Sequence, residues 1–303
     1  MLTLPKVEDL ELELSTLCNA KCQLCYRNYK AYPNHYPTNK TRSLEDVVAQ
    51  LDTFVDLKWI RLVGSISEPT LYKRFFDLIK YIKNRHVNIE ICTNGDTHNQ
   101  LWWAELSTLL TSDDKVYFTI CGSTQELHEY YRANTRLSNI LNNARAFRTS
   151  NKNDYAQCIR FEYNNDDFNS DAFKSMVSEF SNVYWTETFL NKPSHTYVDT
   201  SRLPGLQPAP PKIDSYLAMS KFADIKYASG IRGKANCMSW ENHSQQVDID
   251  GRIYPCYLFL EASGGEPWDG DYEKILTMSY DVCKFCDRAV TDLCDAKDLR
   301  YII

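Results

Sequence analysis

The chain has 303 residues, a net charge of −6 at pH 7 and 24% charged side chains. This length allows one large domain and a small second one. Basic residues are scattered and no apolar run is long enough to span a bilayer, so we expect neither a nucleic-acid partner nor a membrane partner. Eleven cysteines without a secretion signal favour metal ligation in a reducing, cytoplasmic compartment over a disulfide framework.

Short β-rich runs alternate with amphipathic helical runs up to about residue 190. The expected strands are residues 8–15, 59–63, 88–92, 115–121, 157–163 and 182–187. The expected helices are residues 43–57, 71–84, 99–110, 139–149 and 169–180. Ser43 followed by Asp46 is an N-cap signal for the first helix. The repeat predicts an α/β fold of parallel strands with right-handed crossovers, which a doubly wound sheet and a partial barrel both satisfy.

A proline-rich run, LPGLQPAPP at residues 203–211, divides the chain. Proline fixes φ and removes backbone donors, so this run predicts an extended linker. The expected organisation is a first domain at residues 1–203, a linker at 204–211 and a small cysteine-rich domain at 212–303.

Three cysteines, Cys18, Cys22 and Cys25, follow the first expected strand in the spacing C-x3-C-x2-C. Structural zinc takes four ligands, so three thiolates suit an iron–sulfur cluster that keeps one iron open. A zinc knuckle, or three unrelated buried thiols, is the alternative interpretation.

The segment STLCNAKCQLCYR resembles the cysteine loop of radical SAM enzymes, which follows the first barrel strand. The resemblance implies a partial (β/α)6 barrel and a [4Fe–4S] cluster whose fourth iron binds S-adenosylmethionine. It also implies reductive cleavage of S-adenosylmethionine to a 5′-deoxyadenosyl radical that abstracts a substrate hydrogen. The electron would come from a flavodoxin- or ferredoxin-like donor.

Later loops resemble further motifs of that family. LVGSISEPTL resembles the Gly-Gly-Glu-Pro motif that holds the amino group of the cofactor, with Ser67 in place of the second glycine. CTNG resembles the Thr-Asn-Gly turn beside the cofactor, although an ordinary strand-ending turn has the same pattern. VYFTICGSTQELHEYYR resembles a segment in which Thr119 replaces a cofactor-binding serine and Arg132 pairs with the cofactor carboxylate. The resemblance thus implies a cofactor-binding set of Leu24, Gly64, Ser67, Glu68, Asn94, Thr119 and Arg132.

Cys121 stands where relatives carry an aspartate. It is a candidate hydrogen donor to a substrate radical, like the critical cysteine of radical SAM epimerases. The alternative is a small buried hydrophobe, which is how an unpaired cysteine usually behaves. Cys92 and Cys158 have the same two interpretations, and His128 is expected to pack or cap.

Four cysteines of the C-terminal region form a second candidate metal site. Cys237 and Cys256 bracket a hairpin with a predicted type I′ turn at Asp250–Gly251, and Cys283 and Cys286 form a C-x2-C pair. The spacing permits zinc or an iron–sulfur cluster. The segment resembles the first half of a SPASM domain in its truncated twitch form, which implies one auxiliary [4Fe–4S] cluster. Cys294 is an alternative ligand or a free thiol.

The resemblance implies a radical SAM enzyme that oxidises, cross-links or epimerises its substrate, with a peptide or protein slightly favoured. A small-molecule dehydrogenase or cyclase is the alternative within the family. The auxiliary cluster would relay electrons or shape the barrel floor. A non-catalytic zinc or iron–sulfur protein is the alternative of another class. A dinucleotide-dependent dehydrogenase is excluded, because the turn after strand one carries cysteines instead of a glycine-rich motif.

Overall fold

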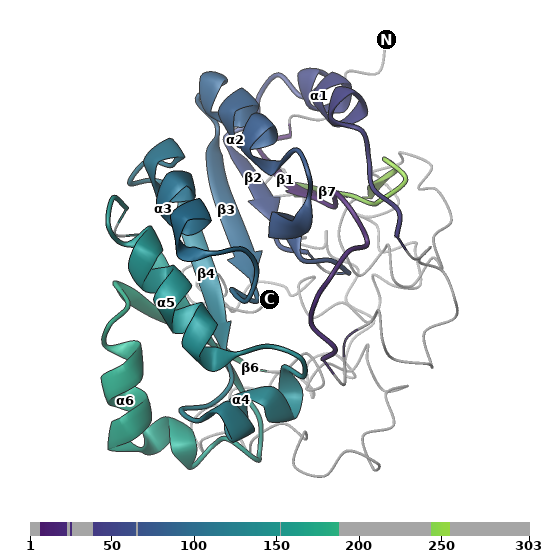
Figure 1. The fold of residues 1–303 in the computed structure, drawn as a ribbon. Coiled ribbons are helices and arrows are strands. Elements are labelled where there is room, and N and C mark those ends of the chain that lie inside the picture. Colours follow the sequence, from purple (N-terminus) through teal and green to yellow (C-terminus); the bar gives the residue numbers. More distant parts are fainter. Residues whose placement is uncertain are drawn as a thin grey trace, which may run out of the picture.

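The computed structural model describes residues 7–22, 25, 39–64, 66–151, 153–187 and 244–254. Within them lies a single sheet with helices against one side (Figure 1). The predicted linker and the cysteines beyond residue 254 lie outside the described residues, so the predicted domain boundary stays a prediction.

The sheet contains eight strands in the order β6-β5-β4-β3-β2-β1-β7-β8. Their bounds are β1 (Asp9–Leu12), β2 (Trp59–Leu62), β3 (Asn88–Thr93), β4 (Lys115–Ile120), β5 (Asp154–Arg160), β6 (Asn182–Glu187), β7 (Ser244–Val247) and β8 (Ile253–Tyr254). From β1 to β6 each strand pairs in parallel with its predecessor. This confirms the predicted parallel α/β fold.

The helices connect successive strands. They are α1 (Leu44–Asp52), α2 (Phe75–Asn84), α3 (Gln100–Leu109), α4 (Gln125–Tyr131), α5 (Leu137–Phe147) and α6 (Asp171–Val177), with 3-10 turns η1 (Pro69–Leu71) and η2 (Asp167–Asn169). Because each crossover is expected to be right-handed and each strand is added at the same side, the crossovers return on one face of the sheet.

The two faces of the sheet differ in polarity. On one face residues such as Leu10 and Ile89 belong to the same apolar core as the buried helix side chains. The intervening residues of the same strands, such as Glu11 and Glu90, lie on the opposite face. A doubly wound sheet buries both faces in apolar helices, whereas here one face is polar. The arrangement is therefore that of a partial barrel.

Local signals explain most helix starts. Ser43 caps α1 by accepting a hydrogen bond from the Asp46 amide at 3.0 Å, as predicted. α1 ends at Asp52 instead of residue 57. The guanidinium of Arg85 donates to the carbonyls of Leu51 and Phe54, both at 2.7 Å, and so satisfies carbonyls that a longer helix would use itself.

Further elements differ from the sequence prediction. β1 ends at Leu12 instead of residue 15, α2 begins at Phe75 instead of residue 71, and α6 spans Asp171–Val177 instead of residues 169–180. β5 begins at Asp154, three residues before the predicted start, because the buried Asp154 is anchored by Arg148 at 2.6 Å and by the Ser181 hydroxyl at 2.7 Å. α4 is absent from the predicted helices although Thr124 caps it, since seven residues are too few for a clear helical period.

The hairpin of β7 and β8 extends the sheet beside β1. β7 runs parallel to β1, with Glu11 opposite Gln246, and antiparallel to β8. The predicted type I′ turn is wrong, because Gly251 has a positive φ of 79° and Asp250 is not among the positive-φ residues of the described chain. Gly251 N donates to Asp248 O and Asp248 N to Arg252 O, both at 3.0 Å. This pattern is a type I turn followed by a glycine bulge.

Among the helices that the structure describes, none combines the length and the apolar character that crossing a bilayer requires.

Asp114, the residue directly before β4, fixes the start of β3. It is fully buried, and it accepts hydrogen bonds from the Ile89 amide at 2.7 Å and from the Thr111 amide at 2.7 Å. Lys83 Nζ lies 2.7 Å from the same carboxylate. The carboxylate therefore joins β3, α2 and the loop before β4.

We predict that Asp114→Ala lowers the free energy of unfolding by about 3–5 kcal/mol, because Lys83 and two amides lose a buried partner. The neighbouring exposed Asp113 is the matched control, and Asp113→Ala should change it by no more than about 0.5 kcal/mol. Urea denaturation followed by circular dichroism measures both. Equal losses in the two variants would contradict the assignment.

Candidate active site

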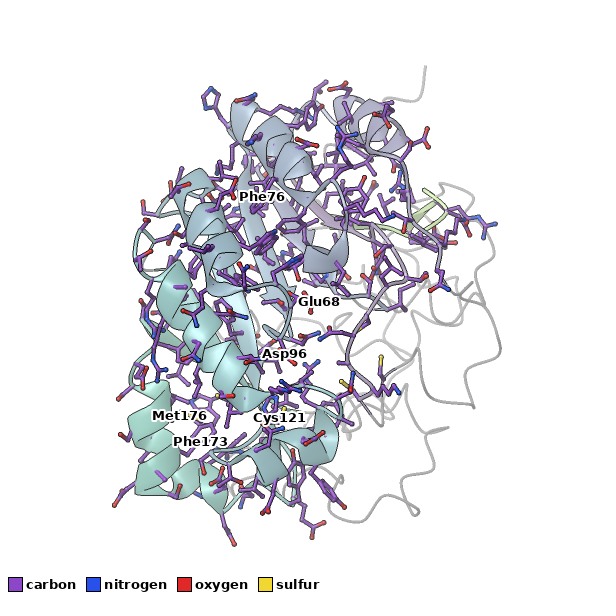
Figure 2. The ribbon with its side chains drawn as sticks, viewed as in Figure 1. Glu68, Phe76, Asp96, Cys121, Phe173 and Met176 are labelled. Atoms are coloured by element: carbon purple, nitrogen blue, oxygen red, sulfur yellow. The ribbon has the colours of Figure 1, made fainter. Side chains whose placement is uncertain are left out.

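The loops at the carboxyl ends of β1 to β4 meet at one edge of the sheet. The cysteine loop follows β1, Glu68 follows β2, Asn94 follows β3 and Cys121 follows β4. Carboxyl ends of parallel strands place their loops together, which is where barrel enzymes build their sites. Figure 2 shows Glu68, Asp96 and Cys121 in succession along this edge.

The three cysteines of the first loop lie close to one another. The Cys25 amide donates to the Cys22 carbonyl at 3.2 Å, which closes a turn between them. Burial, the Glu68 carboxylate and the other two thiols raise the pKa of Cys18 to about 12. Cys18 and Cys25 pack against the small cluster that contains the buried Cys22 and Cys121.

Backbone bonds hold this loop against its neighbours. Glu68 N donates to the Leu17 carbonyl at 2.7 Å, and Lys21 N donates to the Ala133 carbonyl at 2.8 Å. The first bond ties the cysteine loop to the loop after β2, and the second ties it to the end of α4. Leu24, the remaining predicted residue of this loop, lies outside the described residues.

The donor set fits the expected cluster and cofactor. Cys22 belongs to a small buried cluster against which Cys18 and Cys25 pack. Three thiols gathered in this way suit an iron–sulfur cluster that keeps one iron open.

Arg132 supplies the positive charge beside these thiols. Its Nη1 donates to Cys22 Sγ at 3.6 Å. Its Nε is buried and has no hydrogen-bond partner. An unpartnered buried donor beside the thiols fits an anionic group of a bound cofactor, as predicted for the carboxylate of S-adenosylmethionine.

Glu68 is the most connected of the predicted site residues. Its side chain is buried, and Oε1 accepts from the Thr93 hydroxyl at 2.7 Å and from the Thr70 hydroxyl at 2.7 Å. Oε2 accepts from the Asn94 amide at 2.7 Å. Burial raises the pKa of Glu68, and these donors act in the opposite direction. The carboxylate therefore joins the loops after β2 and β3.

Gly64 and Ser67 shape the loop before Glu68. Gly64 has a positive φ of 61°, and a Cβ there would lie 2.4 Å from the Ser67 carbonyl oxygen, so glycine is required. The Ser67 hydroxyl donates to Glu13 Oε2 at 3.0 Å, and the Ile66 amide donates to Glu13 Oε1 at 3.3 Å. The serine that replaces the family glycine is thus tethered to β1.

Asn19 connects the cysteine loop to two other loops and was missed by the sequence prediction. The Asn94 side-chain amide donates to Asn19 Oδ1 at 2.8 Å, and Asn19 Nδ2 donates to the Asp96 carbonyl at 2.8 Å. Asn134 Nδ2 donates to the Asn19 carbonyl at 2.6 Å. The available signal was its position between Cys18 and Cys22.

Thr119 and Cys121 close the site on the side of β4. The Thr119 hydroxyl donates to the Thr93 carbonyl at 3.2 Å and lies 3.0 Å from Gln157 Oε1. Cys121 is 0% exposed and packs with Cys22 and Phe161. Burial raises the pKa of the Cys121 thiol to about 11, although the nearby positive charge of Arg132 acts to lower it.

His128 helps to position Arg132 through a hydrogen-bond chain that passes through Thr135. Burial lowers the pKa of His128 to about 3, so the ring is neutral. Nδ1 accepts from the Cys121 amide at 3.3 Å, which leaves the hydrogen on Nε2 to be donated to Thr135 Oγ1 at 3.0 Å. Thr135 Oγ1 in turn donates to the Arg132 carbonyl at 2.6 Å. This agrees with the expected packing role.

The predicted second metal site lies outside the described residues. This applies to all of its candidate ligands, Cys237, Cys256, Cys283, Cys286 and Cys294.

Curated relatives match about two fifths of the chain. A tungsten-containing aldehyde ferredoxin oxidoreductase cofactor-modifying protein of Pyrococcus furiosus is 30% identical over 115 residues, 37% of this chain and 30% of that protein. The mycofactocin maturase MftC of Mycobacterium tuberculosis is 26% identical over 126 residues, 41% of this chain and 30% of that protein. The chain thus spans under a third of the length of these relatives.

Solved structures share the fold. Streptococcus suis SuiB bound to its precursor peptide SuiA has a TM-score of 0.63 at 12% identity and covers 93% of this chain and 71% of SuiB. AnSMEcpe with bound AdoMet has a TM-score of 0.56 at 16% identity and covers 92% of this chain and 88% of anSMEcpe.

Residues 12–161 match the family model of the Radical SAM superfamily. These residues run from the end of β1 through β5, and they include the cysteine loop, Glu68, Asn94, Thr119 and Arg132. The family match, the parallel partial barrel and the three-cysteine loop at its carboxyl edge together show that this chain belongs to the radical SAM superfamily of enzymes.

Proposed function

We propose that this enzyme abstracts a hydrogen atom from a peptide or protein substrate, which leads to oxidation, cross-linking or epimerisation. The main observation behind the proposal is the contact of Arg132 with Cys22. Hydrogen bonds join the loop that contains Cys22 to Glu68 and to Asn94. These contacts support one compact site for a cluster and a nucleotide. SuiB was solved with a precursor peptide and MftC is a maturase, which supports a peptide as the substrate class.

Cys18, Cys22 and Cys25 would hold the cluster, and S-adenosylmethionine would bind beside it. When bound, this pair supplies one electron and a carbon-centred radical that removes hydrogen from a positioned C–H bond. Arg132 would pair with the cofactor carboxylate through its unpartnered Nε. Gly64 and Ser67 would leave backbone groups within reach of the cofactor.

The polar side chains of Asn94 and Thr119 would complete the cofactor site together with Leu24. Their present bonds to Asn19 and Thr93 hold them at the edge of the sheet. We extend the proposal to an auxiliary [4Fe–4S] cluster held by Cys237, Cys256, Cys283 and Cys286, and to a flavodoxin- or ferredoxin-like electron donor.

Anaerobic reconstitution tests the proposal. The protein should bind about eight irons if both clusters form, or about four with the first cluster alone. It should release 5′-deoxyadenosine from S-adenosylmethionine under dithionite. A protein that binds zinc at Cys18, Cys22 and Cys25 and releases no 5′-deoxyadenosine would overturn it.

Cys22→Ala should lower the iron content by about four atoms and reduce 5′-deoxyadenosine to background, because two thiolates do not hold the cluster. Iron analysis and chromatography of the nucleoside measure the two effects. Cys158→Ala is the control, since Cys158 belongs to the apolar core and not to the cysteine cluster. If the control loses as much iron as Cys22→Ala, the ligand assignment is wrong.

Glu68→Gln should lower the free energy of unfolding by about 2–4 kcal/mol, because an amide group replaces an oxygen that accepts buried hydrogen bonds. Affinity for S-adenosylmethionine should fall with it, because the loops after β2 and β3 separate. Urea denaturation and equilibrium dialysis measure these changes. Glu126→Gln, at an exposed position, is the control, and unchanged stability in Glu68→Gln would reject the proposed role.

A further inference from the structure

The face of the sheet opposite the described helices carries a set of polar side chains below the active-site edge. We call Asp9, Glu11, Glu90 and Gln246 the acidic floor. Glu11 stands opposite Gln246 on β7 and opposite Arg61 on β2, which in turn stands opposite Glu90 on β3. The acidic floor therefore spans four neighbouring strands on one face.

Among the described residues of these strands negative charge exceeds positive charge, because Asp9, Glu11 and Glu90 share the face with Arg61 and with Lys115, the register partner of Glu90. Arg61 Nη2 lies 2.6 Å from Asp9 Oδ2. Burial opposes the charge of Arg61, while Asp9, Glu90 and Glu11 raise its pKa, so three carboxylates share this guanidinium. The next cation along the face, Lys115, places its ammonium 5.2 Å from the centre of the Trp59 ring.

Two acceptors of the acidic floor have no hydrogen-bond partner. Asp9 is 8% exposed and Gln246 is 2% exposed, yet Asp9 Oδ1 and Gln246 Oε1 are both unpartnered. Gln246 Nε2 donates to Glu11 Oε1 at 3.0 Å, so its carbonyl oxygen is held beside that carboxylate. Arg61 Nε, a donor, is unpartnered as well. Buried acceptors are normally satisfied, so the two acceptor atoms, Asp9 Oδ1 and Gln246 Oε1, indicate a ligand that donates hydrogen bonds.

The acidic floor lies on the same face of the sheet as the cofactor site, further toward the amino ends of the strands. Glu90 precedes Asn94 by four residues on β3, which corresponds to about 13 Å along the strand. Tyr117, Tyr155 and Tyr184 line the next strands of the same face, with the first two rings stacked at 4.5 Å. A cationic group bound at the acidic floor would therefore lie on the same face of the sheet as the cofactor site, toward the amino ends of the strands.

We propose that the acidic floor binds a cationic group of the substrate, an ammonium or guanidinium such as a lysine or arginine side chain carries. Such a group donates several hydrogen bonds and offsets the excess negative charge. The inference rests on the proposed function and names the class of substrate side chain that the site takes.

The test compares n-pentylammonium with neutral 1-pentanol, two probes of the same shape, on the reconstituted enzyme by ligand-observed NMR. The ammonium should bind at least about tenfold more tightly than the alcohol. Glu90→Gln and Glu11→Gln should each reduce that preference to less than about threefold. Glu105→Gln, an exposed position on α3, should leave it unchanged.

Equal binding of the two probes, no binding of the ammonium at tens of millimolar, or a preference that survives both floor variants would overturn the inference. Release of 5′-deoxyadenosine by the unmodified enzyme without probe is measured separately. Its presence together with equal probe binding rejects the acidic floor alone, and its absence rejects the proposed function.

Discussion

The buried carboxylate of Glu68 is the interaction on which the active-site edge depends. It accepts hydrogen bonds from Thr70 in its own loop, from Thr93 at the end of β3 and from Asn94 directly after β3. The backbone amide of Glu68 donates to the Leu17 carbonyl and so holds the cysteine loop. Loops have no ladder to fix them, so the Glu68 side chain joins the ends of β2 and β3, and the Glu68 backbone amide adds the loop after β1. Without it, thiols and cofactor-binding groups would not share one rigid frame.

The division of the sheet into two faces separates stability from chemistry. Alternate residues of each strand join the helices in one apolar core, which supplies the burial that stabilises the fold. The opposite residues are free to be polar, because the described crossover helices all pack on the first face. Unpartnered acceptors such as Gln246 Oε1 persist there. A protein retains such costly atoms where a ligand completes them, which is why this face is the place to look for substrate recognition.

Much of the fold could be predicted because its signals are local. Alternation located β2 and β6 to within one residue, and the Ser43 N-cap was correct. The sequence prediction failed where residues far apart in the sequence determine the local structure. The end of α1 depends on Arg85 from another helix, and the turn at Gly251 takes a bulge instead of the type I′ form. The role of Asn19 was invisible because its partners lie more than 70 residues away.

The sequence by itself determined the chemical class of the site. Three thiols at C-x3-C-x2-C, followed by Glu68 and Asn94 after the next two strands and by Arg132 in the segment after the fourth, identify the family without any coordinates. Only the tertiary structure decided that Arg132 contacts Cys22, that Cys121 is fully buried, and that Gln246 lies beside Glu11. Ligand type is encoded in residue identity and spacing, whereas charge balance and burial depend on which strands become neighbours.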